Sequence, residues 1–215
     1  MSKKSDSLHP AKPALVSRVD ELREALQRVP ANLLAERTGA SYHAIGPGRG
    51  EFRLSLVGAP TIITFPDFRI YDTADNELPP FFQAMLMYYF DSPNALPVTG
   101  KWISFADLPD GRVYQSAFQG NTGSLLVKTF GLNIASLRKA CENLAGVALN
   151  GYGDAAYTIQ ALPYIPIMVN YWQEDEDFPS TCKLLFDESV SHYLPTEACA
   201  ILGGMLARKV VRSAA

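Results

Sequence analysis

The sequence predicts an α+β fold with antiparallel sheet, and three observations point to it. Apolar residues change period along the chain, from three- and four-residue steps to alternation and back again. The expected strands gather in two meanders, at about 41–71 and 146–186, whose connections are too short for a parallel crossover. Helical segments flank both meanders, so we expect a single α+β domain over residues 14–215.

The N-terminal part of the chain is expected to be a tail followed by helices. Residues 1–13 contain Lys, Ser and Pro without apolar periodicity, which is typical of a disordered tail. Apolar residues then recur at helical spacing from Leu15 to Val29. A second short helix is expected to end at Gly39, because glycine is common just after a helix.

The first meander is predicted from alternation and from its turns. Phe52, Leu54 and Leu56 alternate with polar residues, as in a half-buried strand. The glycine-rich segment 46–50 is similar in composition to a phosphate-binding loop. It lies between two expected strands rather than between a strand and a helix, so we expect a hairpin loop there.

Helices are expected on both sides of the second meander. A helix that begins at Pro79-Pro80 is apolar nearly all round, which predicts deep burial. Residues 114–130 are expected to be helical with an interruption at 120–123, and a last helix is expected from Thr196 to about Arg212. Because the order of helix, meander and helix occurs twice, we propose two pseudo-repeated halves with a cleft between them.

Composition limits the classes of partner. The 215 residues include 19 Lys and Arg against 22 Asp and Glu, so the strongly basic surface of a nucleic-acid-binding protein is absent. The longest apolar run, 161–169, is short and broken by prolines, so no membrane partner is expected. The polar N-terminus lacks a secretory pattern, which predicts a soluble, cytoplasmic protein. The three cysteines have no metal-binding spacing.

Two blocks of residues resemble a known family. The first block contains Trp102, Ser104, Phe105, Leu108, Pro109, Gly111, Tyr114 and Phe118. The second contains Gly153, Asp154, Leu162, Pro163, Pro166, Trp172, Asp175, Glu176, Phe178, Pro179, Leu185, Phe186, Asp187 and Tyr193. Over about residues 36–206 the chain is similar to an uncharacterised family, a domain of unknown function of anaerobic bacteria and archaea.

The resemblance implies a context and no particular reaction. Some members of that family carry an added iron–sulfur cluster module, and the context it implies is anaerobic metabolism with redox or corrinoid cofactors nearby. This chain has only three cysteines and no cysteine-rich module, so the resemblance implies no cluster here and leaves the cofactor unknown.

The leading functional hypothesis is an accessory protein that binds a small molecule or cofactor in an aromatic-lined cleft. Aromatic rings can line a pocket for a flat ligand, although packing in the core is the alternative for each of them. The candidates are Trp102, Phe105, Tyr114, Phe118 and Trp172. Carboxylates are expected at the rim of this cleft, and they are Asp154, Asp175 and Glu176.

The acidic run 174–177 leaves two further functions open. Clustered carboxylates suit Ca²⁺ or Mg²⁺, which makes Asp175, Glu176 and Asp187 candidate metal ligands. They also suit acid–base chemistry, so the second hypothesis is a carboxylate-based enzyme, with or without a divalent metal. A solvated hairpin turn is the structural alternative. The third hypothesis is a protein-interaction module or homodimer without a ligand.

Overall fold

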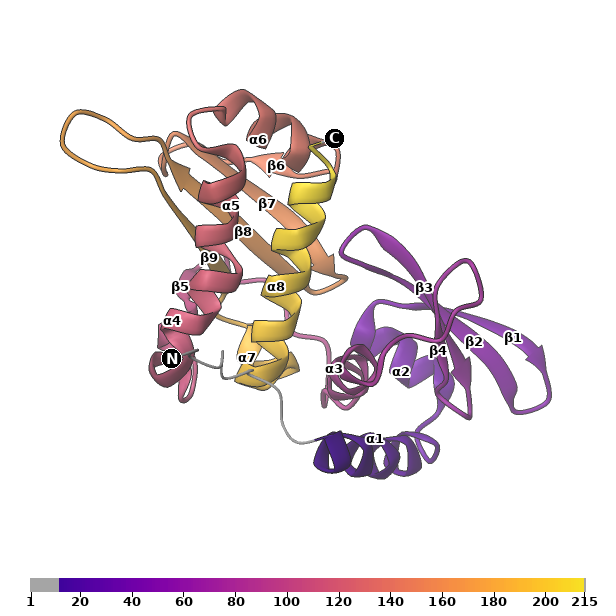
Figure 1. The fold of residues 1–215 in the computed structure, drawn as a ribbon. Helices are drawn as coiled ribbons and strands as arrows, with labels where there is room; N and C mark the ends of the chain where they lie inside the picture. The colour runs from indigo at the N-terminus through magenta and orange to yellow at the C-terminus, as the bar shows by residue number, and fades with distance from the viewer. Residues whose placement is uncertain (1–11, 215) are drawn as a thin grey trace.

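The computed structural model describes residues 12–214, which form an α+β structure with two separate antiparallel sheets (Figure 1). The predicted fold class and its two meanders are therefore confirmed. Residues 1–11 of the expected tail lie outside the described residues, and α1 (Lys12–Leu26) already includes residues 12 and 13. Within the described part of the chain, no helix is long and apolar enough to cross a membrane.

The N-terminal half, residues 12–91, is a four-stranded meander covered by helices. After α2 (Ala31–Thr38), the strands follow in the order β1 (Ser41–Gly46), β2 (Arg49–Leu56), β3 (Ala59–Phe65) and β4 (Ile70–Tyr71). The expected alternation is present in β2, where Phe52, Leu54 and Leu56 are buried. The glycine-rich segment forms the β1–β2 hairpin, as expected. Deep burial of α3 (Pro80–Phe90) is confirmed.

The C-terminal half is built on a five-stranded sheet. Its strand order is β5-β9-β8-β7-β6. The bounds are β5 (Trp102–Ser104), β6 (Val147–Ala148), β7 (Ala155–Leu162), β8 (Ile165–Trp172) and β9 (Thr181–Asp187). Strands β6 to β9 occupy the meander expected at about 146–186. The pairing of β5 with β9 at the edge of this sheet was not predicted, because β5 lies far from the meander in sequence.

Helices pack on the second sheet, and one of them, α8, also contacts α3 of the other half (Figure 1). The helical bounds are η1 (Phe105–Asp107), α4 (Gly111–Asn121), α5 (Gly123–Phe130), α6 (Ile134–Glu142), α7 (Val190–Tyr193) and α8 (Thr196–Arg212). The helix expected at 114–130 is broken at Thr122, as its glycines indicate. At Gly123 a Cβ atom would lie 2.0 Å from the carbonyl oxygen of Cys182, so only glycine lets α5 begin this close to β9.

A buried tyrosine joins the two halves. The hydroxyl of Tyr89, in α3, donates to the carbonyl oxygen of Thr38 at 2.8 Å and accepts from the backbone N–H of Tyr164 at 3.1 Å. Tyr164 lies in the β7–β8 turn, so this turn contacts both α2 and α3 of the N-terminal half. The proposed pseudo-repeat of the halves stays a prediction.

Candidate ligand-binding site

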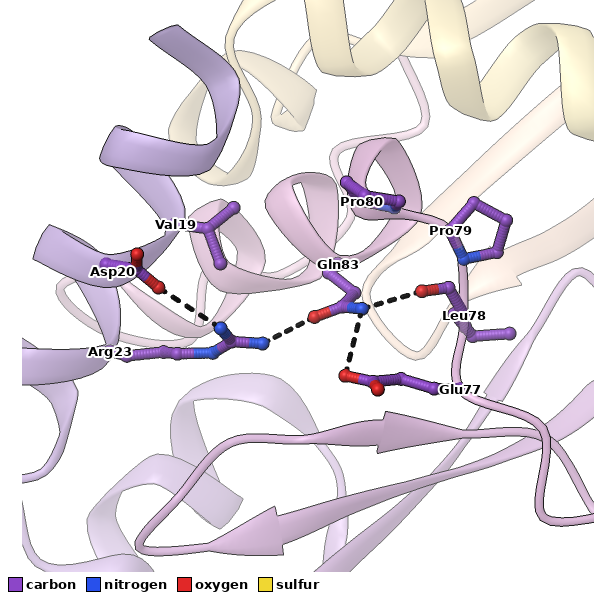
Figure 2. Close-up of a pocket in the computed structure, with 8 residues that line it drawn as sticks. All are labelled: Val19, Asp20, Arg23, Glu77, Leu78, Pro79, Pro80 and Gln83. Atoms are coloured by element: carbon purple, nitrogen blue, oxygen red, sulfur yellow. Dashed lines mark hydrogen bonds and ion pairs between the residues drawn. The ribbon is translucent and has the colours of Figure 1, made fainter. Parts of the chain in front are cut away.

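A pocket of about 450 Å³ lies between α1 and the start of α3 (Figure 2). Its lining residues are Val19, Asp20, Arg23, Glu77, Leu78, Pro79, Pro80 and Gln83. A second, more polar hollow of about 490 Å³ shares Arg23 and Glu77 and adds Gln27, Asp67 and Arg69. We call the two hollows together the α1–α3 pocket.

The spacing of residues along α1 explains one wall of the pocket. Val19, Leu22 and Leu26 recur at three- and four-residue steps and are buried in the core. Asp20 and Arg23 are three residues apart and therefore adjacent on the helix surface, where they form an ion pair. The apolar face thus holds α1 on the body of the protein and places a charged edge at the pocket.

Arg23 is the centre of the hydrogen bonding in this pocket (Figure 2). Its Nη1 donates to Oδ1 of Asp20 at 3.2 Å, and its Nε donates to the carbonyl oxygen of Phe68 at 3.3 Å. Its Nη2 donates to Oε1 of Gln83. These bonds come from three different elements, so the planar guanidinium group is held in one orientation at the pocket wall.

Gln83 continues these bonds to the other side of the pocket. Its side-chain Nε2 donates to the carbonyl oxygen of Leu78 at 2.6 Å and to Oε1 of Glu77 at 3.3 Å. The residue is only 8% exposed, and a buried amide is costly unless its polar atoms are paired. Because a guanidinium only donates and a carboxylate only accepts, Arg23 and Glu77 fix which way the amide faces.

Charges of both signs surround the α1–α3 pocket. Arg23 and Arg69 supply positive charge. Asp20, Asp67 and Glu77 supply negative charge. The pKa of Arg69 is raised by its hydrogen bond with Tyr71 and by the nearby charges of Glu77 and Asp67, so this side chain stays cationic. Groups of both charge signs therefore line the pocket.

The structure places two of the five predicted aromatic residues within the core. The rings of Phe105 and Phe118 stack with their centroids 4.2 Å apart and an interplanar angle of 8°, and both side chains are buried. Tyr114 lies exposed on α4 and Trp102 is half-buried on β5. Trp172 is partly exposed at the end of β8.

The two tryptophans lie on the strands that flank β9, beside its opposite ends. Trp102 pairs with Asp187 at the last residue of this strand, whereas Trp172 pairs with Thr181 at its first. At about 3.3 Å per residue, these positions are roughly 20 Å apart. The structure therefore does not bring the two tryptophan blocks to one common cleft.

The predicted carboxylates also lie apart. Oδ2 of Asp154 accepts from the backbone N–H of Gln173 at 2.8 Å. Asp175 and Glu176 are exposed in the β8–β9 connection, and Asp187 is buried at the far end of β9. Among residues 12–214, no group of three His, Cys, Asp or Glu side chains is placed to hold a metal ion.

Asp187 anchors the segment that links the two halves. Its carboxylate accepts backbone N–H groups of Thr99 at 3.1 Å, Gly100 at 2.7 Å and Ser189 at 3.0 Å. Burial acts to raise the pKa of this carboxyl, but the hydrogen bonds from Ser189, Thr99 and Gly100 outweigh it and hold the pKa below its ordinary value. Both carboxylate oxygens of Asp187 already accept hydrogen bonds within the chain, so the role of this side chain is structural.

The sequence predictions missed every residue of the α1–α3 pocket. One signal was present, because Gln83 is the only amide or charged residue in α3, a helix otherwise buried nearly all round. A lone amide in such a helix indicates a buried hydrogen-bond network. Its partners, Arg23 and Glu77, are 60 and 6 residues away in sequence, and only the fold brings them together.

The fold and the pocket together define an α+β protein with a charged surface pocket beside its first helix. Residues 31–209 match the family described as a domain of unknown function, DUF3786. The match covers most of the chain, so the protein belongs to this family. No curated protein and no solved structure gives a significant match.

Only part of the lining of the α1–α3 pocket lies within the residues that match the family. Glu77 and Gln83 lie inside the matched region, whereas Asp20 and Arg23 are on α1, before it. The expectation of an uncharacterised family is confirmed. The link to anaerobes and the iron–sulfur module of some relatives stay predictions.

Proposed function

We propose that this protein binds a small molecule carrying both a positive and a negative group in the α1–α3 pocket. The observation that supports the proposal is the chain of hydrogen bonds from Asp20 through Arg23 and Gln83 to Glu77. A guanidinium and a carboxylate that are already oriented lose little freedom when a ligand arrives, which favours affinity.

The chemistry of the pocket suits a zwitterion of roughly amino-acid size. Arg23 and Arg69 match a ligand carboxylate, because guanidinium N–H groups form charge-assisted hydrogen bonds to it. Glu77 and Asp20 match an ammonium group. Leu78, Pro79 and Pro80 offer apolar surface for the carbon part of the ligand. A volume of about 450 Å³ falls in the usual range for small-molecule pockets.

The wider role follows from the family resemblance. An accessory role in anaerobic metabolism is part of this proposal and is supported by that resemblance alone. A carboxylate-based enzyme has less support, because the candidate carboxylates do not gather among the described residues. A cleft lined by Trp102 and Trp172 also has less support, since the two tryptophans lie beside opposite ends of β9.

A thermal-shift screen tests the proposal. The probes are the free α-amino acids, with dicarboxylates and diamines of similar length as compounds of a single charge sign. We expect at least one amino acid to raise the melting temperature, and Arg69→Gln to abolish that shift. Arg49→Gln, at an exposed arginine that does not line the pocket, is the matched control and should keep it. Equal shifts from a dicarboxylate or a diamine would contradict the zwitterion.

A further inference from the structure

A second surface of the protein, at one end of the C-terminal sheet, exposes large apolar side chains. Phe178 is 71% exposed, Leu132 60%, Tyr152 46% and Trp172 36%. Single exposed apolar residues are ordinary. Here Trp172 and Phe178 are carried by one hairpin, and Leu132 and Tyr152 lie on segments near its base. We call these four residues the hairpin patch, because the β8–β9 hairpin carries two of them.

Hydrogen bonds gather the segments of the hairpin patch around Gln173. The backbone N–H of Gln173 donates to Oδ2 of Asp154, two residues after Tyr152, at 2.8 Å. Its side-chain Nε2 donates to the carbonyl oxygen of Leu132 at 3.1 Å. Gln173 follows Trp172 directly, so three separate segments of the chain meet at this point. In Figure 1 the β8–β9 connection extends well beyond the sheet.

The tip of the β8–β9 hairpin is ordered by its own hydrogen bonds. Oδ1 of Asp175 accepts from the backbone N–H groups of Asp177 at 2.9 Å and Phe178 at 2.8 Å. The N–H of Asp175 donates to the carbonyl oxygen of Phe178 at 3.0 Å. At the base, the N–H of Glu174 donates to Oγ of Ser180 at 2.9 Å. The backbone at Phe178 is therefore fixed by a closed turn, and its side chain is exposed there, so little backbone freedom is lost on binding.

Acidic side chains predominate beside the hairpin patch, although Lys183 and Arg138 also lie near it. Four exposed carboxylates occur in succession at residues 174–177. The ring of Trp172 already faces a cation within the chain, since Nζ of Lys183 lies 5.9 Å from its centroid. Apolar side chains next to a row of carboxylates are complementary to a partner that carries both apolar and basic side chains.

We propose that the hairpin patch docks a basic segment of a protein partner. Phe178 and Trp172 are the apolar anchors, as aromatic residues commonly are at interfaces. Lysine or arginine side chains of the partner pair with Glu174, Glu176 and Asp177. The patch belongs to the C-terminal half and shares no residue with the α1–α3 pocket, so this inference is independent of the proposed function.

The test is a selection of short random peptides, of about twelve residues, displayed on phage and bound to the immobilised full chain. We expect enriched peptides to combine Lys or Arg with an apolar or aromatic residue. Calorimetry with the best peptide should give a dissociation constant that rises about tenfold with Phe178→Ser. Val113→Ser is the matched control, because Val113 is equally exposed, at 75%, but lies on α4. It should leave the affinity unchanged.

The charge of the partner is tested separately. Replacing Glu174 and Glu176 together by Gln should weaken the same peptide several-fold and reduce the dependence of its affinity on salt. Asp175 is left intact in this variant, because its carboxylate closes the turn. Enrichment of peptides without basic residues, or an affinity that Phe178→Ser leaves unchanged, would overturn the proposal. A dimer in sedimentation that Phe178→Ser dissociates would also overturn it, since the occupant would then be a second copy of the chain.

Discussion

The backbone N–H of Val57 donates to the carbonyl oxygen of Ala161 at 2.8 Å, which joins the β2–β3 turn to the end of β7. Val57 adopts a φ of 50°, in the left-handed region that β-branched residues rarely occupy. Its side chain is buried with only 3% exposed. The contact between the two halves thus holds an unfavourable backbone conformation in place, and the burial of the side chain offsets its cost.

Substitutions at Val57 should separate backbone strain from burial. Val57→Ala loses buried methyl groups, at about 0.8 kcal/mol each, and keeps the left-handed conformation. Val57→Gly loses slightly more side chain but removes a strain of about 1 to 2 kcal/mol. We expect both variants to be destabilised in urea unfolding, with the glycine variant at least as stable as the alanine variant. A clearly more stable alanine variant would contradict the left-handed conformation.

Two glycines near the α4–α5 break should respond oppositely to alanine. Gly123→Ala places a methyl group against the carbonyl oxygen of Cys182, at a separation of 2.0 Å in the present backbone, so α5 must move away from β9. We expect a loss of more than about 3 kcal/mol in the free energy of unfolding. At Gly120 nothing lies within 4 Å of the added carbon. Gly120→Ala should therefore be neutral or stabilising, by up to about 1 kcal/mol. Equal effects would argue against the α5–β9 contact.

Asp187 should make stability depend on acid pH. Its pKa is lower in the folded protein than in the unfolded chain, where it is about 3.9. Such a group adds stability above the unfolded pKa and loses it as the pH falls through the folded value. Asp187→Asn should lower the free energy of unfolding by about 2 kcal/mol near neutral pH. The gap between this variant and the wild type should narrow as unfolding is measured from about pH 6 to pH 3. A gap that widens on acidification would contradict the lowered pKa, and exposed Asp177→Asn is the control.

Gln83→Leu should destabilise the protein although it replaces an amide with an apolar side chain in a buried helix. The change leaves Arg23, Glu77 and the carbonyl oxygen of Leu78 without their common partner. We expect a loss of about 1 to 3 kcal/mol in urea unfolding. The exposed Gln27→Leu, at the edge of the same pocket, should change stability by less than about 0.5 kcal/mol. A stabilised Gln83→Leu would show that the network is not formed.

The three thiols should be unreactive until the protein unfolds. Cys141, Cys182 and Cys199 are all buried, and burial raises the pKa of each thiol, that of Cys141 to about 12. The thiolate is the reactive form, so alkylation of the native protein should be very slow at pH 8. Labelling followed by mass spectrometry should give no adduct under native conditions and three in urea. Rapid labelling of one thiol in the native protein would indicate an opening of the core around it.

The sequence predicts most of this fold, because its periodicities are local. The strands at 155–162 and 165–172 and the buried helix from Pro80 follow from the apolar pattern and the turn residues. Pairing of β5 with β9 could not be predicted, since Trp102 and Asp187 are far apart in sequence and β5 has only three residues. A short strand at a sheet edge has no periodicity of its own.

The candidate site was harder to predict, because charged residues that are adjacent in sequence do not necessarily converge in the folded structure. The acidic run is conspicuous in sequence, yet Asp175 caps its own turn and Asp187 lies at the other end of β9. Arg23 and Gln83 are ordinary members of two separate helices, and only the packing of α1 on α3 makes them partners. The resemblance to a family identified the class of the chain but carried no chemistry to these positions.

The most direct test of the proposal that the α1–α3 pocket binds a zwitterion is an NMR titration that follows side-chain signals. The amino acid that raises the melting temperature is added to ¹⁵N-labelled protein, and the signals of the Gln83 side-chain amide and the Arg23 Nε–H are recorded. We expect saturable shifts of both signals, while the side-chain amide of Asn170, buried in β8 and outside the pocket lining, does not move. Saturable shifts that spare Gln83 and Arg23 and occur elsewhere would contradict it.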